Sequence, residues 1–196
     1  MLDIAGATAL LLLSLPVVAV VVVAFACDTA LHARDRGGLL YREPRVSRGR
    51  TFGLLKFRTL RTDVLARAGG HARLLEAEPA NLTWLGRRIL KPWYLDELPQ
   101  LWNVLRGDIS LVGPRPWPPQ LVEQQRAEGL TYRDEVPAGL TGLAQLSKGS
   151  ARLYADLDLE YVERVGALGS WALVRYDMEI LARTIKVMAR GEGLSY

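Results

Sequence analysis

The sequence has 196 residues but contains only one cysteine, Cys27, and two histidines, His32 and His71. A single cysteine excludes an intramolecular disulfide and any cysteine-rich zinc site. The two histidines are far apart in the sequence, which argues against a metal site built from histidines. The chain is therefore expected to fold without disulfides or structural zinc, and its length is that of about one domain.

Lysine is scarce as well. Only four of the 25 basic residues are lysine and the others are arginine, in a chain with a net charge of +4. Arginine binds a phosphate group through two parallel hydrogen bonds, whereas lysine acts as a point charge. The excess of arginine favours anionic partners, although GC-rich codon usage combined with a solvated surface would give the same composition.

Charged residues are absent from residues 4–27. As a helix, this run would be long enough to cross the hydrocarbon core of a bilayer, which is about 30 Å thick. A secretory signal peptide would begin with basic residues and have a shorter apolar run, and a buried core helix of this length would be unusual in a small domain. We therefore predict a membrane-inserted helix over residues 1–28 and a catalytic or binding domain over residues 29–196.

Pro16 interrupts the apolar run near its middle, and Ser14 precedes it by two residues. A proline inside a helix removes one backbone hydrogen bond and kinks the helix, and a serine hydroxyl can cover part of the freed backbone. Two geometries are compatible with this break. One is a kinked helix that spans the bilayer, and the other is a re-entrant hairpin that enters and leaves through the same leaflet.

Basic residues dominate directly after the apolar run, because residues 28–61 carry nine cations and three anions. Positive charges next to a membrane segment stay on the cytoplasmic side and bind anionic lipid headgroups. We therefore expect the domain to lie on the cytoplasmic face, with membrane lipid as a partner. Nucleic acid is not expected as a partner, because few aromatic residues accompany these charges and no nucleic-acid-binding motif is present.

Residues 51–62 have the alternation of a strand, with Lys56 and Arg58 on one face and Phe57 and Thr59 on the other. Two neighbouring cations on one face are costly unless an anionic group faces them. The alternative is an edge strand whose charged face is solvated.

Two adjacent carboxylates, Asp96 and Glu97, occupy the centre of the chain. The apolar residues that follow them recur at helical spacing: Leu98, Leu101, Trp102 and Leu105. Because Gly107 is a typical helix end, we expect Asp96 at or near the N-terminus of this helix, where anions are favoured. A loop stiffened by prolines then carries Arg115. The combination suggests phosphate chemistry, although an Asp-Glu pair in a first helical turn is commonly only a cap.

Other elements are expected on either side of this centre. They are a helix-compatible segment over 63–78, a connector over 81–90, a short apolar segment over 109–112, a short helix over 121–128, a glycine-rich turn and strand over 136–146, and helices over 154–165 and 170–189. The last helix has an apolar stripe flanked by basic residues. It is expected either to pack on the core or to lie in the membrane interface.

The central residues 95–108 (LDELPQLWNVLRGD) and 110–116 (SLVGPRP) resemble the bacterial sugar transferases of the monotopic phosphoglycosyl transferase superfamily, in its minimal catalytic form. Residues 56–59 (KFRT) and 139–145 (GLTGLAQ) support the resemblance, which covers nearly the whole chain. It implies an α/β (α+β) fold: a mostly helical catalytic domain with short strands, a re-entrant N-terminal membrane hairpin and interfacial amphipathic helices.

The resemblance also implies a reaction and a location. Such enzymes transfer a phosphosugar from a nucleotide sugar, usually a UDP-sugar, to polyprenyl (undecaprenyl) phosphate and release UMP, as the first membrane step of a glycoconjugate pathway. A covalent aspartyl-phosphosugar intermediate is formed, and Mg²⁺ is the cofactor. The expected location is the bacterial inner membrane, with the catalytic domain on the cytoplasmic face.

Carried over to this sequence, the resemblance assigns Asp96 as the nucleophile and Glu97 as the Mg²⁺ ligand. Residues expected to bind phosphate or nucleotide are Lys56, Arg58, Lys91, Arg115, Thr141 and Gln145. The membrane break would be at Ser14 and Pro16. Lys91 departs from the family pattern, in which arginine is typical. The alternative is a membrane-anchored, non-catalytic scaffold of the same fold, and the sequence leaves the sugar, the pathway and the oligomeric state open.

Overall fold

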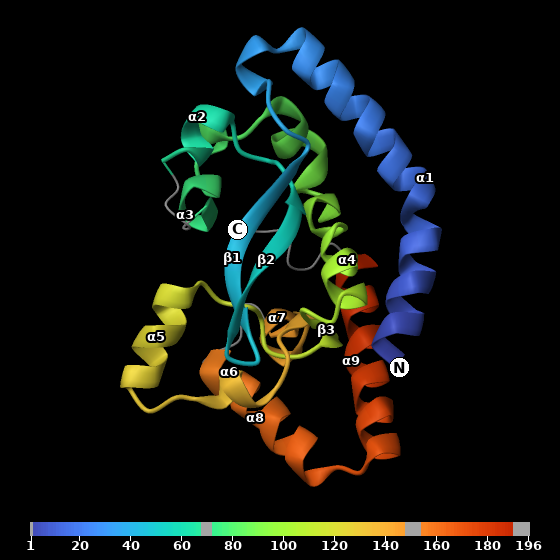
Figure 1. Cartoon of the computed structure of the whole chain (residues 1–196). Helices are drawn as coiled ribbons and strands as arrows, with labels where there is room; N and C mark the ends of the chain where they lie inside the picture. Colours follow the sequence, from blue (N-terminus) through green and yellow to red (C-terminus); the bar gives the residue numbers. More distant parts are fainter. Residues whose placement is uncertain (1, 68–71, 148–153, 190–196) are drawn as a thin grey trace. The chain divides into compact units, whose positions relative to one another are not determined.

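The computed structural model describes residues 2–67, 72–147 and 154–189, which form a mostly helical fold with short strands, as expected (Figure 1). In chain order the elements, with η denoting short 3-10 or π-helical turns, are α1 (Leu2–Leu31), η1 (Ala33–Asp35), β1 (Leu40–Ser47), β2 (Arg50–Phe57), α2 (Thr62–Leu65), α3 (Ala72–Glu76), η2 (Pro79–Asn81), η3 (Gly86–Leu90), η4 (Leu95–Glu97), α4 (Gln100–Leu105), β3 (Ser110–Val112), α5 (Pro119–Ala127), α6 (Tyr132–Glu135), β4 (Gly139–Thr141), α7 (Leu143–Leu146), α8 (Tyr154–Ala167) and α9 (Ser170–Ala189).

These elements belong to two compact units, and each is described by itself. The first unit contains Met1–Gly6, Arg45–Phe52 and Val104–Tyr196, and the second unit contains Ala7–Pro44 and Gly53–Asn103. The chain passes from one unit to the other within α1, β1, β2 and α4.

The second unit is built around an apolar core that α1 helps to form. Val21 of α1 is buried together with Phe57 of β2, and with Leu85 and Leu90 from the segment that includes η3. Burial of such side chains contributes about 1.5–3 kcal/mol each. The packing therefore fixes the C-terminal half of α1 against β2 and η3 within this unit.

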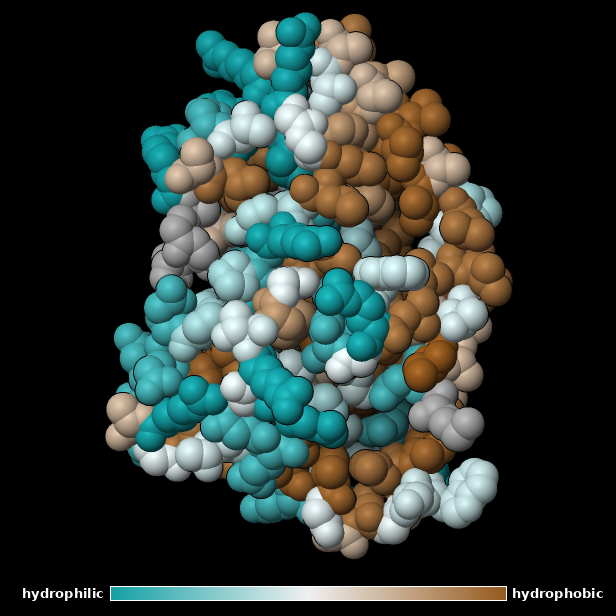
Figure 2. Space-filling view, in the orientation of Figure 1, coloured by the Kyte–Doolittle hydropathy of each residue, from teal (hydrophilic) through white to brown (hydrophobic). Residues whose placement is uncertain are grey.

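Most of α1 is nevertheless exposed and apolar. Large side chains such as Leu13 and Val20 are 75% and 68% exposed, and Figure 2 shows hydrophobic residues gathered along this helix. Its length and composition are sufficient to cross a membrane. An apolar surface of this size is the kind that lipid covers, which agrees with the predicted membrane segment.

Pro16 lies inside α1, which the structure shows as one continuous helix from Leu2 to Leu31. Because proline has no N–H, the carbonyl of Leu12 loses its usual helical donor. The Ser14 hydroxyl donates 2.9 Å to the carbonyl of Leu11, one residue earlier.

The first unit contains a short parallel pair of strands, β3 and β4, in which Ser110 pairs with Gly139 and Val112 with Thr141. The last helix, α9, contacts β3, β4 and α7 (Figure 1). Ile180 of α9 is buried, whereas Trp171 and Ile185 are 87% and 68% exposed. The predicted apolar stripe thus packs on the unit in part and leaves the rest of its surface uncovered.

Three predicted elements differ from the structure. Within 136–146 the strand is limited to Gly139–Thr141, and Leu143–Leu146, expected as a strand after the glycine-rich turn, form helix α7. The connector expected over 81–90 contains the helical turn η3, because Leu85 and Leu90 are buried and their backbone folds compactly around them. The helix-compatible segment 63–78 is occupied by α2 and α3, and its residues 68–71 lie outside the described part of the chain.

The helix after the acid pair is also different in detail. Trp102, expected on its apolar face, is 53% exposed, whereas Asn103 is completely buried. The Asn103 amide accepts a hydrogen bond of 2.9 Å from the backbone N–H of Leu55 and donates one of 3.0 Å to the carbonyl of Gly53. The side chain therefore pairs with β2 as a neighbouring strand would, and this buries a polar position of α4 in place of Trp102.

Candidate active site

Asp96 lies in η4, a single turn that precedes α4. The expectation of a helix N-terminus is therefore corrected, because α4 begins only at Gln100. Tyr94, directly before η4, has a positive φ of 53°, a left-handed conformation that costs a non-glycine residue about 1–2 kcal/mol. This turn leaves Asp96 only 2% exposed, while Glu97 is half-buried.

Lys91 provides the cation nearest to Asp96. Its Nζ atom lies 3.4 Å from Oδ2 of Asp96. Lys91 directly follows η3 and is almost completely buried. The same ammonium group also pairs closely with Glu76 of α3. Lys91 is thus shared between two carboxylates, and one of them is the predicted nucleophile.

Two further contacts extend this arrangement. The Thr59 hydroxyl donates a hydrogen bond of 3.1 Å to Glu76, and Nζ of Lys56 lies 3.5 Å from Oε2 of Glu43. We call the five ionisable residues the charged cluster: Glu43, Lys56, Glu76, Lys91 and Asp96. All five belong to the second unit. Of the two alternatives left open for Lys56, the structure supports the one in which an anion faces it, and Glu43 is that anion.

The charged cluster changes the acidity of its carboxyl groups. Burial raises the pKa of Asp96 to about 6, the positive charge of Lys91 opposes the rise, and the negative charge of Glu97 adds to it. Burial alone would also raise the pKa of Glu76. The positive charges of Lys56 and Lys91, with hydrogen bonds from Lys91 and Thr59, hold it below its usual value instead. Asp96 is therefore ionised at neutral pH, but its charge is poorly solvated.

Arg58 is buried and directed elsewhere within the second unit. Its guanidinium donates hydrogen bonds to the carbonyls of Gly38, Leu60 and Asp35, at 2.8, 2.8 and 2.6 Å. Burial lowers the pKa of Arg58, while the charge of Asp35 opposes this. The structure thus gives Arg58 a role in tying three backbone segments together, and phosphate binding by this residue stays a prediction.

The remaining predicted residues lie in the first unit. The Thr141 hydroxyl is 2.8 Å from the hydroxyl of Thr184. The side-chain amide of Gln145 is buried, and neither its oxygen nor its nitrogen has a hydrogen-bond partner among the described residues. Buried amides are nearly always paired, so Gln145 has capacity for a ligand.

Arg115 lies in the predicted proline loop, and its carbonyl accepts a hydrogen bond of 2.6 Å from Arg133. Arg133 is itself buried against Asp158, at 2.7 Å. The glycine-rich turn has a packing explanation, because a Cβ on Gly139 would lie 2.1 Å from the backbone nitrogen of Gly113. Glycine is needed there for the close approach of two backbone segments.

Glu43 and Glu76 are the site residues that the sequence did not indicate. Both lie in segments of ordinary polar composition, so no motif distinguishes them. The one available signal was the cost of burying Lys56, which required a carboxylate at an unknown position. Only the fold shows that β1 and α3 supply these groups.

Comparisons with known proteins identify the chain's relatives. A family model described as bacterial sugar transferase matches residues 1–191. The UDP-galactose-lipid carrier transferase of Erwinia amylovora is 36% identical over 208 residues, covering 97% of this chain and 40% of that protein. The undecaprenyl-phosphate glucose phosphotransferase of Komagataeibacter xylinus is 33% identical over 198 residues, covering 94% of this chain and 34% of that protein.

A third relative is closer in length. The UDP-glucose:undecaprenyl-phosphate glucose-1-phosphate transferase of Caulobacter vibrioides is 33% identical over 193 residues, covering 94% of this chain and 67% of that protein. The chain therefore spans well under half the length of the first two relatives and two thirds of the third. The resemblance read from residues 95–108 and 110–116 is confirmed: the chain belongs to the bacterial sugar transferase family.

Proposed function

We propose that this chain transfers a phosphosugar from a UDP-sugar to undecaprenyl phosphate, with Asp96 as the nucleophile. One observation carries the proposal: the carboxylate of Asp96 is buried and contacts the ammonium group of Lys91, which Glu76 also holds. A carboxylate that merely capped a helix would be exposed to solvent and would not need such a partner. The names of the relatives, which specify glucose or galactose transfer to a lipid carrier, support the same reaction class.

The reaction has two displacement steps at one phosphorus atom. A carboxylate oxygen of Asp96 attacks the sugar-linked phosphorus, the bond from this phosphorus to the UMP oxygen breaks, and UMP leaves. A phosphate oxygen of undecaprenyl phosphate then attacks the same phosphorus, and the bond to Asp96 breaks. Asp96 returns as a carboxylate, and the product is undecaprenyl diphosphate sugar. Because an ionised carboxylate is the nucleophile, the first step requires no general base.

Lys91 has a specific task in these steps. While Asp96 is a carboxylate, Lys91 stabilises its buried charge. When Asp96 becomes esterified and loses that charge, Glu76 still neutralises Lys91. Lys91 is then available to the phosphate oxygens on which negative charge accumulates, as phosphoryl transfer requires.

Mg²⁺ fits the chemistry of Glu97. This ion is usually bound by one or two carboxylates together with substrate phosphates, and Glu97 is a half-buried carboxylate adjacent to the proposed nucleophile. When bound, Mg²⁺ would neutralise charge on the diphosphate. Arg115, Thr141 and the unpaired amide of Gln145 are proposed to bind the nucleotide sugar, and Lys56 and Arg58 to add positive charge.

The membrane topology that we propose is the re-entrant hairpin. At one end of α1, Asp3 accepts hydrogen bonds of 2.8 and 2.9 Å from the Ser110 hydroxyl and the Leu111 N–H. At the other end, Asp28 accepts one of 3.3 Å from the Leu85 N–H. If α1 spanned the bilayer, the chain would have to cross back between residues 28 and 110. Among the described residues, only α1 is long and apolar enough to cross.

The test is an assay of UMP release from a panel of UDP-sugars, with undecaprenyl phosphate and Mg²⁺, using the full chain in detergent. Intact-mass spectrometry without acceptor should detect a chain carrying one phosphosugar. Asp96→Asn should lose both signals, while Asp156→Asn, a matched change at an exposed aspartate of α8, should keep both. Full UMP release and adduct formation by Asp96→Asn would disprove the mechanism. Absence of UMP release with every donor would favour the non-catalytic scaffold.

A further inference from the structure

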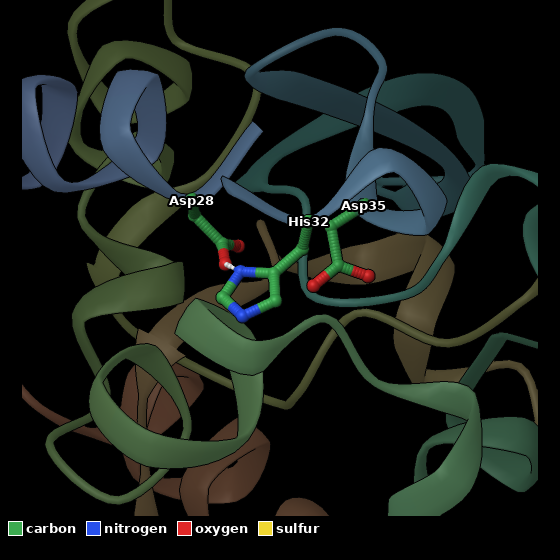
Figure 3. A group of neighbouring side chains, drawn as sticks. All are labelled: Asp28, His32 and Asp35. Atoms are coloured by element: carbon green, nitrogen blue, oxygen red, sulfur yellow. Dashed lines mark hydrogen bonds and ion pairs between the residues drawn. The ribbon is translucent and has the colours of Figure 1, made fainter. Parts of the chain in front are cut away.

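Three potential metal ligands meet where α1 ends, outside the charged cluster. Asp28 lies in the last turn of α1, His32 directly follows this helix, and Asp35 closes η1. One ligand atom from each lies within 4.8 Å of the others, and Figure 3 shows the carboxylate of Asp35 facing the imidazole of His32. The sequence argued against a site made of histidines, but it did not foresee one histidine placed between two aspartates.

Both carboxylates are buried and already oriented. Asp28 and Asp35 are 4% and 6% exposed. Oδ2 of Asp28 accepts a hydrogen bond from the Leu85 N–H, and Oδ2 of Asp35 accepts one of 2.8 Å from the Trp84 N–H. Outer hydrogen bonds of this kind fix the ligand orientation in metal sites.

The other oxygen of each carboxylate faces the group. Oδ1 of Asp28 is 2.8 Å from Nδ1 of His32. Oδ1 of Asp35 accepts no hydrogen bond from the part of the chain that the structure describes. This oxygen is not among the buried side-chain atoms that lack a partner, so it is open to solvent and to an incoming ion.

The charges of the group do not balance without a further cation. Two buried carboxylates carry two negative charges, and Arg58 supplies one positive charge that acts on both. The donors of Arg58 are directed to backbone carbonyls rather than to these carboxylates. An uncompensated buried charge is costly, so a bound cation would be stabilised by this group.

We infer that Asp28, His32 and Asp35 bind a divalent metal ion of the zinc class. One imidazole nitrogen and two carboxylate oxygens are ligands that Zn²⁺ accepts, at about 2.0–2.2 Å. In tetrahedral coordination at these bond lengths two ligand atoms are about 3.4 Å apart. The ligand atoms of the group lie within 4.8 Å of one another, so the widest pair would close by up to about 1.4 Å on binding. The side chain of His32 is 43% exposed, which leaves an entry path and an open coordination position.

The bound ion would have a mechanical consequence. Because Asp28 and Asp35 also hold the backbone at Trp84 and Leu85, the ion would fasten the end of the membrane helix to the segment that leads into η3. The site is independent of the proposed catalysis, in which Asp28, His32 and Asp35 take no part.

The experiment is Zn²⁺ titration by isothermal calorimetry with the full, untagged chain in detergent. The background carries Cys27→Ser, because the exposed thiol next to Asp28 would itself bind zinc. This protein should bind one Zn²⁺ and gain thermal stability.

His32→Gln should weaken Zn²⁺ binding at least tenfold and abolish the gain in thermal stability, and Asp35→Asn should weaken binding similarly. His71→Gln, a change at the other histidine of the sequence, should bind as the background does. Bound Co²⁺ should show visible absorption that His32→Gln loses.

Two outcomes would overturn the inference. One is that the background binds no Zn²⁺, and the other is that His32→Gln binds as tightly as the background. His32 is partly exposed, so its variant is expected to fold even where Asp35→Asn does not. UMP release assayed on the same proteins separates the two proposals, because loss of the zinc site leaves Asp96 and its reaction in place.

Discussion

The ammonium nitrogen of Lys91 lies 3.4 Å from Oδ2 of Asp96, and their side chains are only 11% and 3% exposed. At this separation and burial, the ammonium group of Lys91 favours the ionised form of Asp96 and so lowers its pKa, against the effect of burial. This contact relates the local backbone geometry to the ionisation of the proposed nucleophile. The backbone of η3 and η4 places the two charges together, and their interaction keeps a carboxylate ionised in a site where water is largely excluded.

Replacing Lys91 with methionine should shift the pH dependence of UMP release. Asp96 must be deprotonated to attack, and its pKa of about 6 rises further when the nearby cation is lost. The acid limb of the rate profile should therefore move to higher pH, by about 1–3 units. Lys91→Arg should leave the acid limb at the pH of the wild type, because the positive charge is kept. Lys186→Met, at an exposed lysine of α9, is the control, and an unmoved limb in Lys91→Met would contradict the assignment.

Asp96→Asn should stabilise the folded protein at alkaline pH. The pKa of Asp96 is raised from 3.8 to about 6, so between these values the native state binds more protons than the unfolded state. Stability therefore falls as the pH rises from about 4 to 6, and it stays lower above pH 6. Asparagine does not ionise, so the variant does not lose stability in this way. It should be more stable than the wild type by about 1–3 kcal/mol at pH 8.

Thermal or denaturant unfolding of Asp96→Asn and the wild type, measured at pH 4.5 and at pH 8, checks this sign. The difference in unfolding free energy between the variant and the wild type should shrink toward the lower pH, because the wild-type carboxyl is then protonated. A variant less stable than the wild type at pH 8 but not at pH 4.5 would mean that the contact with Lys91 outweighs burial. Asp156→Asn should show no such pH-dependent difference.

Asn103→Leu should destabilise the second unit. The substitution removes the two hydrogen bonds that the amide makes to β2 and leaves the buried Leu55 N–H without its acceptor, whereas Gly53 is exposed and its carbonyl can bind water. The loss at Leu55 costs about 1–3 kcal/mol and the loss at Gly53 about 0.5–1.5 kcal/mol, so a total of about 2–4 kcal/mol is expected. The free energy of unfolding measures it, with Gln124→Leu at an exposed position of α5 as the control. Equal stability of the two variants would show that the amide pairing is dispensable.

Elements specified by local sequence could be predicted well. The helix over 170–189 was predicted with its observed bounds, because its apolar period is long and uninterrupted. Gly107 was predicted as a helix end, and its φ of 75° is one that glycine adopts without strain. The Asp-Glu pair and the surrounding motif likewise located the candidate site without a structure.

Features that depend on distant partners could not be predicted. Lys91 and Glu76 are separated by α3, η2 and η3, and nothing in either local sequence indicates the other. The sequence did not indicate the burial of Asn103, because its strand partners are about fifty residues earlier in the chain. Burial of polar groups is decided by tertiary pairing, which periodicity does not encode.

Breaking the ion pair of Arg133 should destabilise the first unit. Nη2 of Arg133 lies 2.7 Å from Asp158, with side chains only 4% and 3% exposed, and the guanidinium also stacks on Trp117. Burial raises the pKa of Asp158 to about 6, against the charge of Arg133. Arg133→Met leaves this carboxylate without its ion-pair partner, and the expected loss of unfolding free energy is about 3–5 kcal/mol.

Arg126→Met is the control. It removes a partly exposed pair with Asp134 and should change the unfolding free energy little. Similar losses for the two variants would contradict the argument.

The hairpin topology predicts that both ends of α1 are on the cytoplasmic side. Native Cys27 is exposed near one end, and Leu2→Cys in a Cys27→Ser background introduces a thiol at the other, where the side chain is 40% exposed. An impermeant maleimide should label neither thiol in intact bacterial cells and both after permeabilisation. Spanning of the bilayer by α1 would instead leave exactly one of the two thiols reactive from outside. Such a result would also place the contact of Asp3 with β3 across the membrane from Asp28, which one apolar segment cannot accommodate.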